Sequence, residues 1–350
     1  MEAPRREFLE DLLTTPSPSG YEARGQRVWV DYVEAFADDV RTDEYGNAIA
    51  VYEGGEPAVA VTGHADEIGF IVRKIDEEGF VHFGRIGGSD KTVSKGQHVT
   101  IHGDDPVPGV IGQTAIHLRE GDGEYDDVED QRIDIGVEDG DEARELVEVG
   151  DPITFSSTVQ DLEGTKMAAR GMDNRVGTWV AAEALRRAAD SGVEATVYAV
   201  STVQEEVGLK GARMAGYELA PDAAIAVDVT HATDYAGAPG NKGGDIELGE
   251  GPVIARGSTN NPALVEAVRT AADEADIDYQ LQAAGLRTGT DADAFYTQRS
   301  GIPSLNVGLP NRYMHTPVEV VDTEDLVDVA DLMGAFADRA ADYESFGVEI

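Results

Sequence analysis

The chain has 350 residues, of which 41% are hydrophobic, and it is long enough to bury one large core or two ordinary ones. It contains no cysteine, which excludes disulfide frameworks, zinc fingers and thiolate chemistry, so any metal ion would be held by His, Asp or Glu. The apolar runs are much shorter than the roughly 18 residues that cross a bilayer, and the N-terminal segment carries acids where a signal peptide needs an apolar stretch. We therefore expect no membrane partner and a cytoplasmic location.

The charge balance is strongly acidic: 68 Asp and Glu against 27 Lys and Arg give a formal charge of −41. In dilute buffer such a charge destabilises the compact state through self-repulsion. In molar salt the Debye length falls to about 3 Å, so a dense carboxylate surface becomes tolerable. The composition therefore predicts adaptation to a salt-rich cytoplasm. It also argues against a nucleic-acid partner, because phosphates would meet a field of their own sign.

The N-terminal segment alternates helical and extended patterns. Pro4 stands in a plausible first helical turn, and Pro16 and Pro18 stop that helix. Apolar spacing and turn residues predict helices over 4–13 and 22–37, a hairpin over 40–52 and a buried strand over 58–62.

The pattern changes at residue 68 to short alternating segments separated by Gly-rich turns, which continue to about residue 155 and are typical of a small β-rich domain. Helix and strand patterns alternate again after residue 170, with helices expected over 174–189, 262–275 and from 323, and strands over 195–203, 223–228, 279–283 and 304–307. We therefore predict an α/β fold in which a layered domain, residues 1–67 plus 166–350, is split by an inserted β-barrel-like domain, residues 68–165.

Residues 120–130 contain seven acids. We interpret this run as a solvated loop. Calcium binding is the alternative, although the run has no EF-hand spacing.

His64 is the first candidate for chemistry. It lies in Val-Thr-Gly-His-Ala-Asp-Glu (61–67), at the expected end of a strand, which is where open α/β sheets present ligands. The carboxylate of Asp66 could hold the far ring nitrogen and fix the tautomer that a metal ligand needs. The alternative is a hydrogen-bonded structural histidine.

Carboxylates follow the same logic in the second α/β segment. Asp173 opens an expected helix, Glu205 and Glu206 follow one expected strand, and Asp228 ends another. Because the carboxyl ends of parallel strands meet at one edge of a sheet, these side chains should lie together. One of the adjacent glutamates could then bind a metal while the other acts as a general base. A solvated helix start for the pair, and N-caps or turns for the two aspartates, are the alternatives.

His315, in Tyr-Met-His-Thr-Pro (313–317), completes a set of two histidines and three or four carboxylates on separate loops. That inventory suits two divalent ions, because zinc binds imidazole and carboxylate well without sulfur. A pair of ions bridged by one carboxylate would bind and activate a water molecule. Cobalt or manganese would also fit.

Taken together, these segments resemble the tetrahedral aminopeptidase family, the dinuclear metallopeptidases that include glutamyl and deblocking aminopeptidases. The resemblance covers nearly the whole chain, and the acidic composition indicates a haloarchaeal member. Six ordered motifs carry it: Gly-His-Ala-Asp-Glu-Ile-Gly-Phe (63–70), Met-Asp-Asn-Arg-Val-Gly (172–177), Val-Gln-Glu-Glu-Val-Gly (203–208), Ala-Val-Asp-Val-Thr-His (226–231), Gly-Thr-Asp-Ala-Asp (289–293) and Met-His-Thr (314–316).

The resemblance implies a mixed-sheet α/β/α metallopeptidase domain with two divalent metal ions per subunit, zinc first among the candidates. Asp173 would bridge the ions, His64 and Asp228 would complete one site, and Glu206 and His315 the other. Glu205 would be the general base that activates a metal-bridging water, and Asp66 would orient His64. The enzyme would release N-terminal residues from short peptides.

The resemblance also implies that the inserted domain mediates dimerisation and that dimers form a homo-oligomer, a tetrahedral dodecamer with inward-facing active sites. Two alternatives to the aminopeptidase remain at this stage. One is a glycoside hydrolase of the endoglucanase type that works with two carboxylates, which the two ligand-like histidines and the scarcity of Trp do not favour. The other is a catalytically inactive assembly protein.

The loop 289–293 should shape the substrate pocket. A helix N-cap, in which Thr290 or Asp291 caps residues 292–298, is a second interpretation that is compatible with the first. His231 lies near Asp228 and is a further candidate. The remaining histidines, which should make hydrogen bonds within the inserted domain, are His82, His98, His102 and His117.

Overall fold

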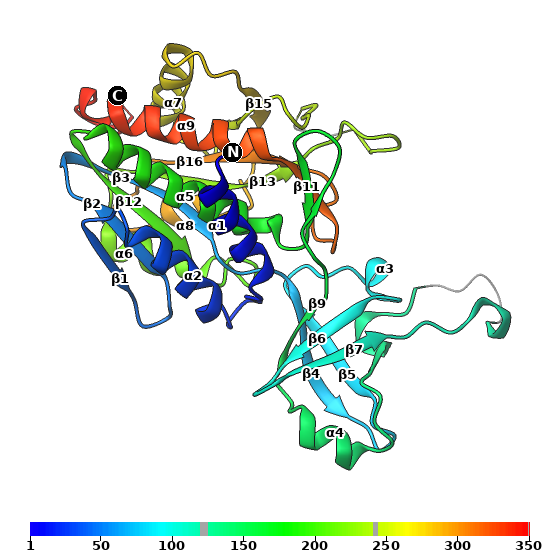
Figure 1. The fold of residues 1–350 in the computed structure, drawn as a ribbon. Helices are drawn as coiled ribbons and strands as arrows, with labels where there is room; N and C mark the ends of the chain where they lie inside the picture. The colour runs from blue at the N-terminus through cyan, green and yellow to red at the C-terminus, as the bar shows by residue number, and fades with distance from the viewer. Residues whose placement is uncertain (120–124, 241–243, 349) are drawn as a thin grey trace.

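The computed structural model describes residues 1–119, 125–240, 244–348 and 350. It contains a layered α/β unit and a small β-barrel that projects from one side of it (Figure 1). Among the described residues, no helix is long and apolar enough to cross a membrane. The α/β fold with an inserted barrel-like domain is therefore confirmed, whereas the exact domain boundaries at 67/68 and 165/166 stay predictions.

An eight-stranded mixed sheet forms the centre of the α/β unit. Its middle strands β12, β3, β13 and β16 run parallel to one another, and β2 and β14 pair antiparallel on the two sides of this group. The parallel strands are mostly buried, as a sheet covered by helices on both faces requires. In spatial order the strands are β1 (Asp39–Thr42), β2 (Ala48–Tyr52), β12 (Ala195–Thr202), β3 (Gly55–His64), β13 (Ala223–His231), β16 (Ser304–Asn311), β14 (Val253–Arg256) and β15 (Gln280–Ala283).

Helices cover both faces of this sheet (Figure 1). Consecutive residues of β3 alternate between two hydrophobic cores: Val59 and Val61 face the larger one, and Ala60 faces the smaller one. The larger core is closed by α1 (Ala3–Thr14), α2 (Ala23–Val33), α5 (Met172–Ser191), α7 (Pro262–Glu274) and α9 (Thr323–Arg339), and the smaller one by α6 (Lys210–Leu219) and α8 (Ala292–Phe295).

A second sheet of three antiparallel strands lies beside the main one. It consists of β10 (Gln160–Asp161), β11 (Lys166–Ala169) and β17 (Glu319–Asp322), with Ala169 paired to Glu319. The sequence analysis missed this sheet and β14 because these strands are only two to four residues long. It also missed α6, although this ten-residue helix is amphipathic. The small sheet matters for the site, since the chain leaves β11 toward α5 and enters β17 from the loop after β16.

The inserted unit is a closed six-stranded barrel. Closure leaves no strand edge unpaired, and the ring of Phe70 packs edge-on against Phe83 and Phe155 in its core. In order around the barrel the strands are β4 (Gly69–Ile75), β5 (Val81–Ile86), β8 (Arg132–Asp134), β7 (Pro106–Ile111), β6 (His98–His102) and β9 (Pro152–Phe155), accompanied by α3 (Lys91–Ser94), α4 (Gly140–Leu146), η1 (Ile116–Leu118) and η2 (Val128–Asp130).

Two of the four barrel histidines make the expected hydrogen bonds. The Nε2 atom of His82 lies 3.1 Å from Asp76, and that of His102 lies 2.8 Å from the Thr154 hydroxyl. His98 and His117 are exposed, and the expectation is wrong for them: neither imidazole has a hydrogen bond with the residues described here.

The acidic run falls partly outside the described residues, which omit 120–124. In its described part, Asp126 and Asp127 form ion pairs with Lys95 and Lys91. Among the residues described, the groups suited to a metal ion lie elsewhere, so calcium binding has no support in this part of the run.

Candidate metal centre

The ends of the parallel strands bring three of the sequence motifs together. His64 is the last residue of β3 and pairs with Thr202, the last residue of β12, so the loop carrying Glu205 and Glu206 begins beside His64. Asp228 lies on the neighbouring strand β13, which continues to His231 rather than ending at Asp228. This edge of the sheet is where α/β proteins collect functional side chains.

Asp173 reaches the same edge from the start of α5. Its backbone is not helical, with φ −75° and ψ 102°, and its peptide bond to Asn174 is cis. The Asn174 side chain donates a hydrogen bond to the Val227 carbonyl at 2.9 Å and accepts one from the Gly177 amide at 3.0 Å. These bonds fix the start of α5 against β13, beside Asp228.

His315 arrives from the loop after β16. Its backbone is left-handed, with φ 64°, a conformation that few residues other than Gly adopt readily. Cross-strand hydrogen bonds between Arg312 and Val320, at 2.9 and 3.0 Å, close the loop on which it stands. The imidazole packs against the backbone of Gly88, in the turn after β5, so the inserted barrel reaches the site.

The distances among these groups define a compact cluster centred on Asp173. Its Oδ1 atom lies 3.1 Å from Nε2 of His64, and its Oδ2 atom lies 3.2 Å from Nε2 of His315. Asp228 Oδ1 is 3.6 Å from the same His64 nitrogen, and Glu206 Oε1 is 3.4 Å from the His315 nitrogen. The structure therefore brings all five expected ligands together.

Glu205 lies at the border of this cluster. Its Oε2 atom is 3.9 Å from Nε2 of His64, and ligand atoms of His64, Glu205 and Asp228 lie within 4.8 Å of one another, as do those of His64, Asp173 and Glu206. By distance alone, Glu205 is thus as close to the cluster as a ligand would be.

The crowded charges shift the ionisation of these side chains. Burial, and then the Asp228, Asp291 and Glu206 carboxylates against the opposing effect of His64, raise the pKa of Glu205 to about 10. Burial and Asp173 raise the pKa of Glu206 to about 7. Burial opposes the protonation of His315, but Asp173 and Glu206 outweigh it and raise its pKa to about 11. The ionisation of each of these side chains therefore depends on its neighbours, and a cation among them would lower the pKa of the carboxyl groups.

The residues present fit divalent metal ions. Two imidazoles and four carboxylates are the ligands that zinc, cobalt and manganese accept in the absence of sulfur. The buried Glu206 Oε1 atom accepts no hydrogen bond from the described residues, which leaves it available to a cation.

Asp66 lies directly beneath the cluster and is fully buried. Its carboxylate accepts hydrogen bonds from the backbone amides of Glu205 and Glu206, at 2.9 and 3.1 Å, and from the Ser19 hydroxyl at 2.6 Å. Nδ1 of His64 lies 3.1 Å from the Asp66 carbonyl oxygen and 3.4 Å from its carboxylate. A proton on Nδ1 therefore directs the lone pair of Nε2 toward Asp173.

The sequence analysis missed Glu319. Its suggestion that the Asp291 side chain caps a helix is wrong. Glu319 is buried and accepts hydrogen bonds from the amides of both His315 and Asp173. The Asp291 side chain does not cap α8; it accepts a 2.5 Å hydrogen bond from Thr202 instead. Only the arrangement of strands in space could have found these contacts, because Glu319 begins a four-residue strand and Asp291 precedes a four-residue helix.

A further ion-pair cluster borders the site. Glu67 accepts hydrogen bonds from Arg170 and Arg175, and all three side chains are buried. Burial would raise the pKa of Glu67, but the two guanidinium groups outweigh it and lower this pKa to about 2.

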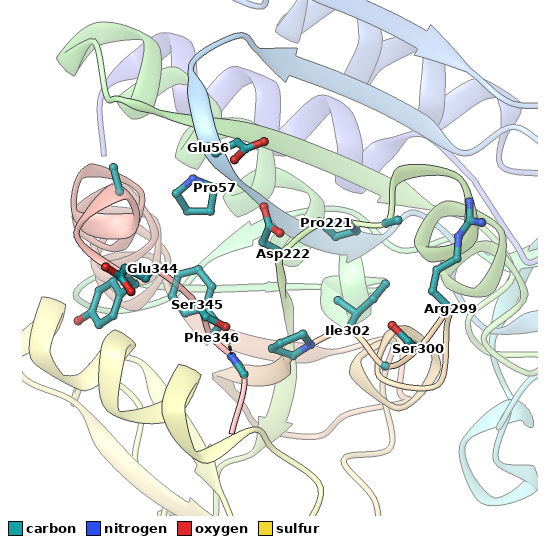
Figure 2. A pocket seen from close by; sticks show the side chains of 16 residues that line it. Glu56, Pro57, Pro221, Asp222, Arg299, Ser300, Ile302, Glu344, Ser345 and Phe346 are labelled. Atoms are coloured by element: carbon teal, nitrogen blue, oxygen red, sulfur yellow. Dashed lines mark hydrogen bonds between the residues drawn. The ribbon is translucent and has the colours of Figure 1, made fainter. Parts of the chain in front are cut away.

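A large cavity of about 700 Å³ lies at the opposite end of the sheet (Figure 2). It is lined by Glu56 and Pro57 at the start of β3, and by Asp222 just before β13. The metal-ligand candidates lie at the carboxyl ends of these same strands, so the cavity is separate from the candidate centre.

Comparison with known proteins agrees with this geometry. The model of the M42 glutamyl aminopeptidase family matches residues 46–332. The lysyl aminopeptidase of Pyrococcus furiosus is 33% identical over 340 residues, which cover 95% of this chain and 96% of that protein. The TET aminopeptidase of a Thaumarchaeota archaeon from marine sediment has a TM-score of 0.90 at 32% identity, covering 96% and 97% of the two chains. The TET1 peptidase of Pyrococcus horikoshii has a TM-score of 0.86 at 33% identity, covering 95% and 99%.

This chain, a mixed α/β sheet with an inserted closed barrel, therefore has the same fold as the two TET structures over nearly its whole length. The chain belongs to the M42 glutamyl aminopeptidase family. It is an aminopeptidase, a hydrolase of peptide bonds, as the sequence motifs predicted.

Proposed function

We propose that this aminopeptidase is a dinuclear metalloenzyme that releases N-terminal residues from short peptides. Asp173 would bridge two divalent ions, with His64 and Asp228 holding one and Glu206 and His315 the other. The observation that carries the proposal is the position of Asp173, whose two oxygens each face the Nε2 atom of a different histidine. Zinc is the first candidate metal, and cobalt and manganese are the others.

When bound, such ions supply Lewis-acid polarisation of the scissile carbonyl and lower the pKa of a nearby water. Within the protein, Glu205 is the proposed general base. It would take the proton of the attacking water and return it to the leaving amine. Its burial and its place beside His64 support this role, since a buried carboxylate among other carboxylates binds a proton readily.

Asp66 and the peptide backbone would hold the base in place. Because the Asp66 carboxylate accepts hydrogen bonds from the amides of both Glu205 and Glu206, it couples the base to a proposed ligand. Asp66 also keeps the His64 ring in one orientation. These contacts would reduce the reorganisation needed before proton transfer.

The proposal extends to the assembly. The barrel would mediate dimers, and dimers would build a homo-oligomer, a tetrahedral dodecamer with inward-facing sites. The Pyrococcus horikoshii TET1 peptidase, which is similar over almost its whole length, can assemble into a tetrahedron or a large octahedral shell. A hollow assembly would admit short, unfolded peptides and exclude folded proteins.

The test is hydrolysis of aminoacyl-anilides and short peptides in molar KCl, with free and N-acetylated amino termini. We expect cleavage of the free-amine substrates, loss of activity on chelation, and recovery when about two equivalents of zinc or cobalt per subunit are restored. Activity that survives complete metal removal would overturn the dinuclear proposal, and equal cleavage of acetylated substrates would overturn the requirement for a free amino terminus.

A further inference from the structure

Glu319 links the two loops that carry Asp173 and His315. Strand β11 ends four residues before Asp173, and β17 begins with Glu319, four residues after His315. Because Ala169 pairs with Glu319 in the antiparallel ladder, both loops leave the same end of this strand pair. Glu319 is therefore placed between them by backbone pairing.

Both oxygens of the Glu319 carboxylate are used. Oε1 accepts a hydrogen bond from the backbone amide of His315 at 2.9 Å, and Oε2 accepts one from the amide of Asp173 at 3.3 Å. The side chains of those two residues face each other, with His315 Nε2 3.2 Å from Asp173 Oδ2. The Glu319 carboxylate thus fixes the distance between the backbones of His315 and Asp173, and this distance determines whether their side chains can meet.

We propose that Glu319 is the positioning residue for the Asp173–His315 half of the metal centre. This inference rests on the proposed dinuclear function. Glu319 would not touch metal or substrate, and it would act by fixing where the bridging carboxylate and the imidazole stand. It complements Asp66, which binds the amides of Glu205 and Glu206 in the same way on the other side of the centre.

The conformation of His315 makes this support necessary. With φ at 64°, its backbone is in the left-handed region, which is unfavourable for a residue with a Cβ. The amide of His315 donates its hydrogen bond to the buried side chain of Glu319, whose Oε1 atom accepts it at 2.9 Å. Glu319 therefore holds the backbone in the conformation that directs the imidazole toward Asp173.

The chain provides a matched control. Asp325, at the start of α9, is also buried, and its two oxygens accept hydrogen bonds from the amides of Gly249 and Gly251 at 2.8 and 2.9 Å. It joins two segments as Glu319 does, but neither segment carries a candidate ligand. Asp325→Asn therefore disturbs a comparable pair of buried hydrogen bonds, at a place where no candidate ligand would move.

The experiment titrates metal-depleted protein with Co²⁺ in molar KCl, following the visible absorption of the bound ion and the heat of binding. Wild type, Glu319→Gln, Glu319→Ala and Asp325→Asn are compared, and unfolding in guanidinium chloride establishes that each variant is folded. We expect two binding steps in wild type and in Asp325→Asn. In the Glu319 variants one step weakens by about 10–100-fold, the range for residues that orient metal ligands, and its absorption band changes.

Glu319→Gln keeps the size of the side chain and one acceptor oxygen, so it retains a folded protein in which one of the two amides loses its partner. Two wild-type binding steps with an unchanged spectrum in this folded variant would overturn the inference, and so would an equal weakening of both steps. If wild type itself bound fewer than two ions, the proposed function would fail, and this inference would fail with it. If wild type shows two binding steps and Glu319→Gln shows the same two, the role of Glu319 would be refuted while the proposed dinuclear function would stand.

Discussion

Gly88 stands against the imidazole of His315 so closely that a methyl group on its Cα would lie 2.7 Å from Nδ1. Gly88 belongs to the inserted barrel, in the turn between β5 and α3, whereas His315 belongs to the α/β unit. A preceding glycine, Gly87, approaches Glu206 in the same manner. The barrel therefore forms one wall of the candidate centre.

Gly88→Ala should push the His315 ring away from Asp173. The added methyl is closer to the ring than van der Waals contact allows, so the ring or the turn must shift. Because a misplacement of about 1 Å can cost on the order of 100-fold in rate, we expect a loss of kcat/KM of tenfold or more. Gly112→Ala is the control, since a Cβ there meets no atom within 4 Å. Equal activity in the two variants would show that the turn yields freely.

Substitution of the two adjacent glutamates should separate their roles. Glu205→Gln removes the proposed base and should lower kcat by about 100- to 10,000-fold while the metal content stays at the wild-type value. Glu206→Gln removes a proposed ligand and should lower the metal content first. The measurements are steady-state kinetics and elemental analysis of the same samples. Near-normal turnover in metal-replete Glu205→Gln would assign the base to another residue.

Asp66→Asn should be far more damaging than Ser19→Ala. The asparagine side chain would place an NH₂ group against one of the amides of Glu205 and Glu206, whereas Ser19→Ala removes a single hydrogen bond from the same carboxylate. An unsatisfied buried donor costs about 1–3 kcal/mol. We expect kcat to fall strongly in Asp66→Asn and slightly in Ser19→Ala. Similar kcat values in both would indicate that Asp66 only fills space.

Glu67→Gln should reduce stability and change its dependence on pH. The pKa of Glu67 is about 2 in the folded protein against its ordinary value of 4.5, so its contribution is complete above pH 4.5 and is lost as the pH falls toward 2. A shift of this size corresponds to about 3 kcal/mol, and the substitution also leaves Arg170 and Arg175 buried without a carboxylate.

Urea unfolding from pH 2 to pH 6 in molar KCl, which keeps the ionic strength fixed, would measure this effect. The difference in unfolding free energy between wild type and Glu67→Gln should be largest at pH 6 and shrink toward pH 2. Glu163→Gln, at an exposed position, is the control. A difference that does not vary with pH would mean that Glu67 loses its proton at the same pH in both states.

The acidic composition predicts that folding requires salt. With a formal charge of −41, self-repulsion should destabilise the protein as the Debye length grows from about 3 Å in molar KCl to about 10 Å at 0.1 M. We expect the thermal midpoint to fall steadily over that range, as followed by circular dichroism. A midpoint independent of salt would argue against the predicted adaptation.

The sequence predicted those residues of the candidate centre that lie on long, regular strands. His64 and Asp228 could be assigned to one edge because they lie on parallel strands whose apolar residues are easy to recognise. The roles of Asp173 and His315 came from motifs rather than from periodicity, since one begins a helix irregularly and the other stands on a loop. Glu319 was missed because β17 is four residues long, and only its pairing with β11 shows what its first side chain reaches.

The order of the strands in space has a consequence for how the protein is made. His64, Asp173, Glu205, Glu206 and Asp228 are all translated before β16, which then inserts between β13 and β14 and delivers the His315 loop. A growing chain thus holds a group of carboxylates with one imidazole until nearly all of it has left the ribosome. The half of the candidate centre that uses His315 would be completed last, so binding of the two proposed ions would follow synthesis rather than accompany it.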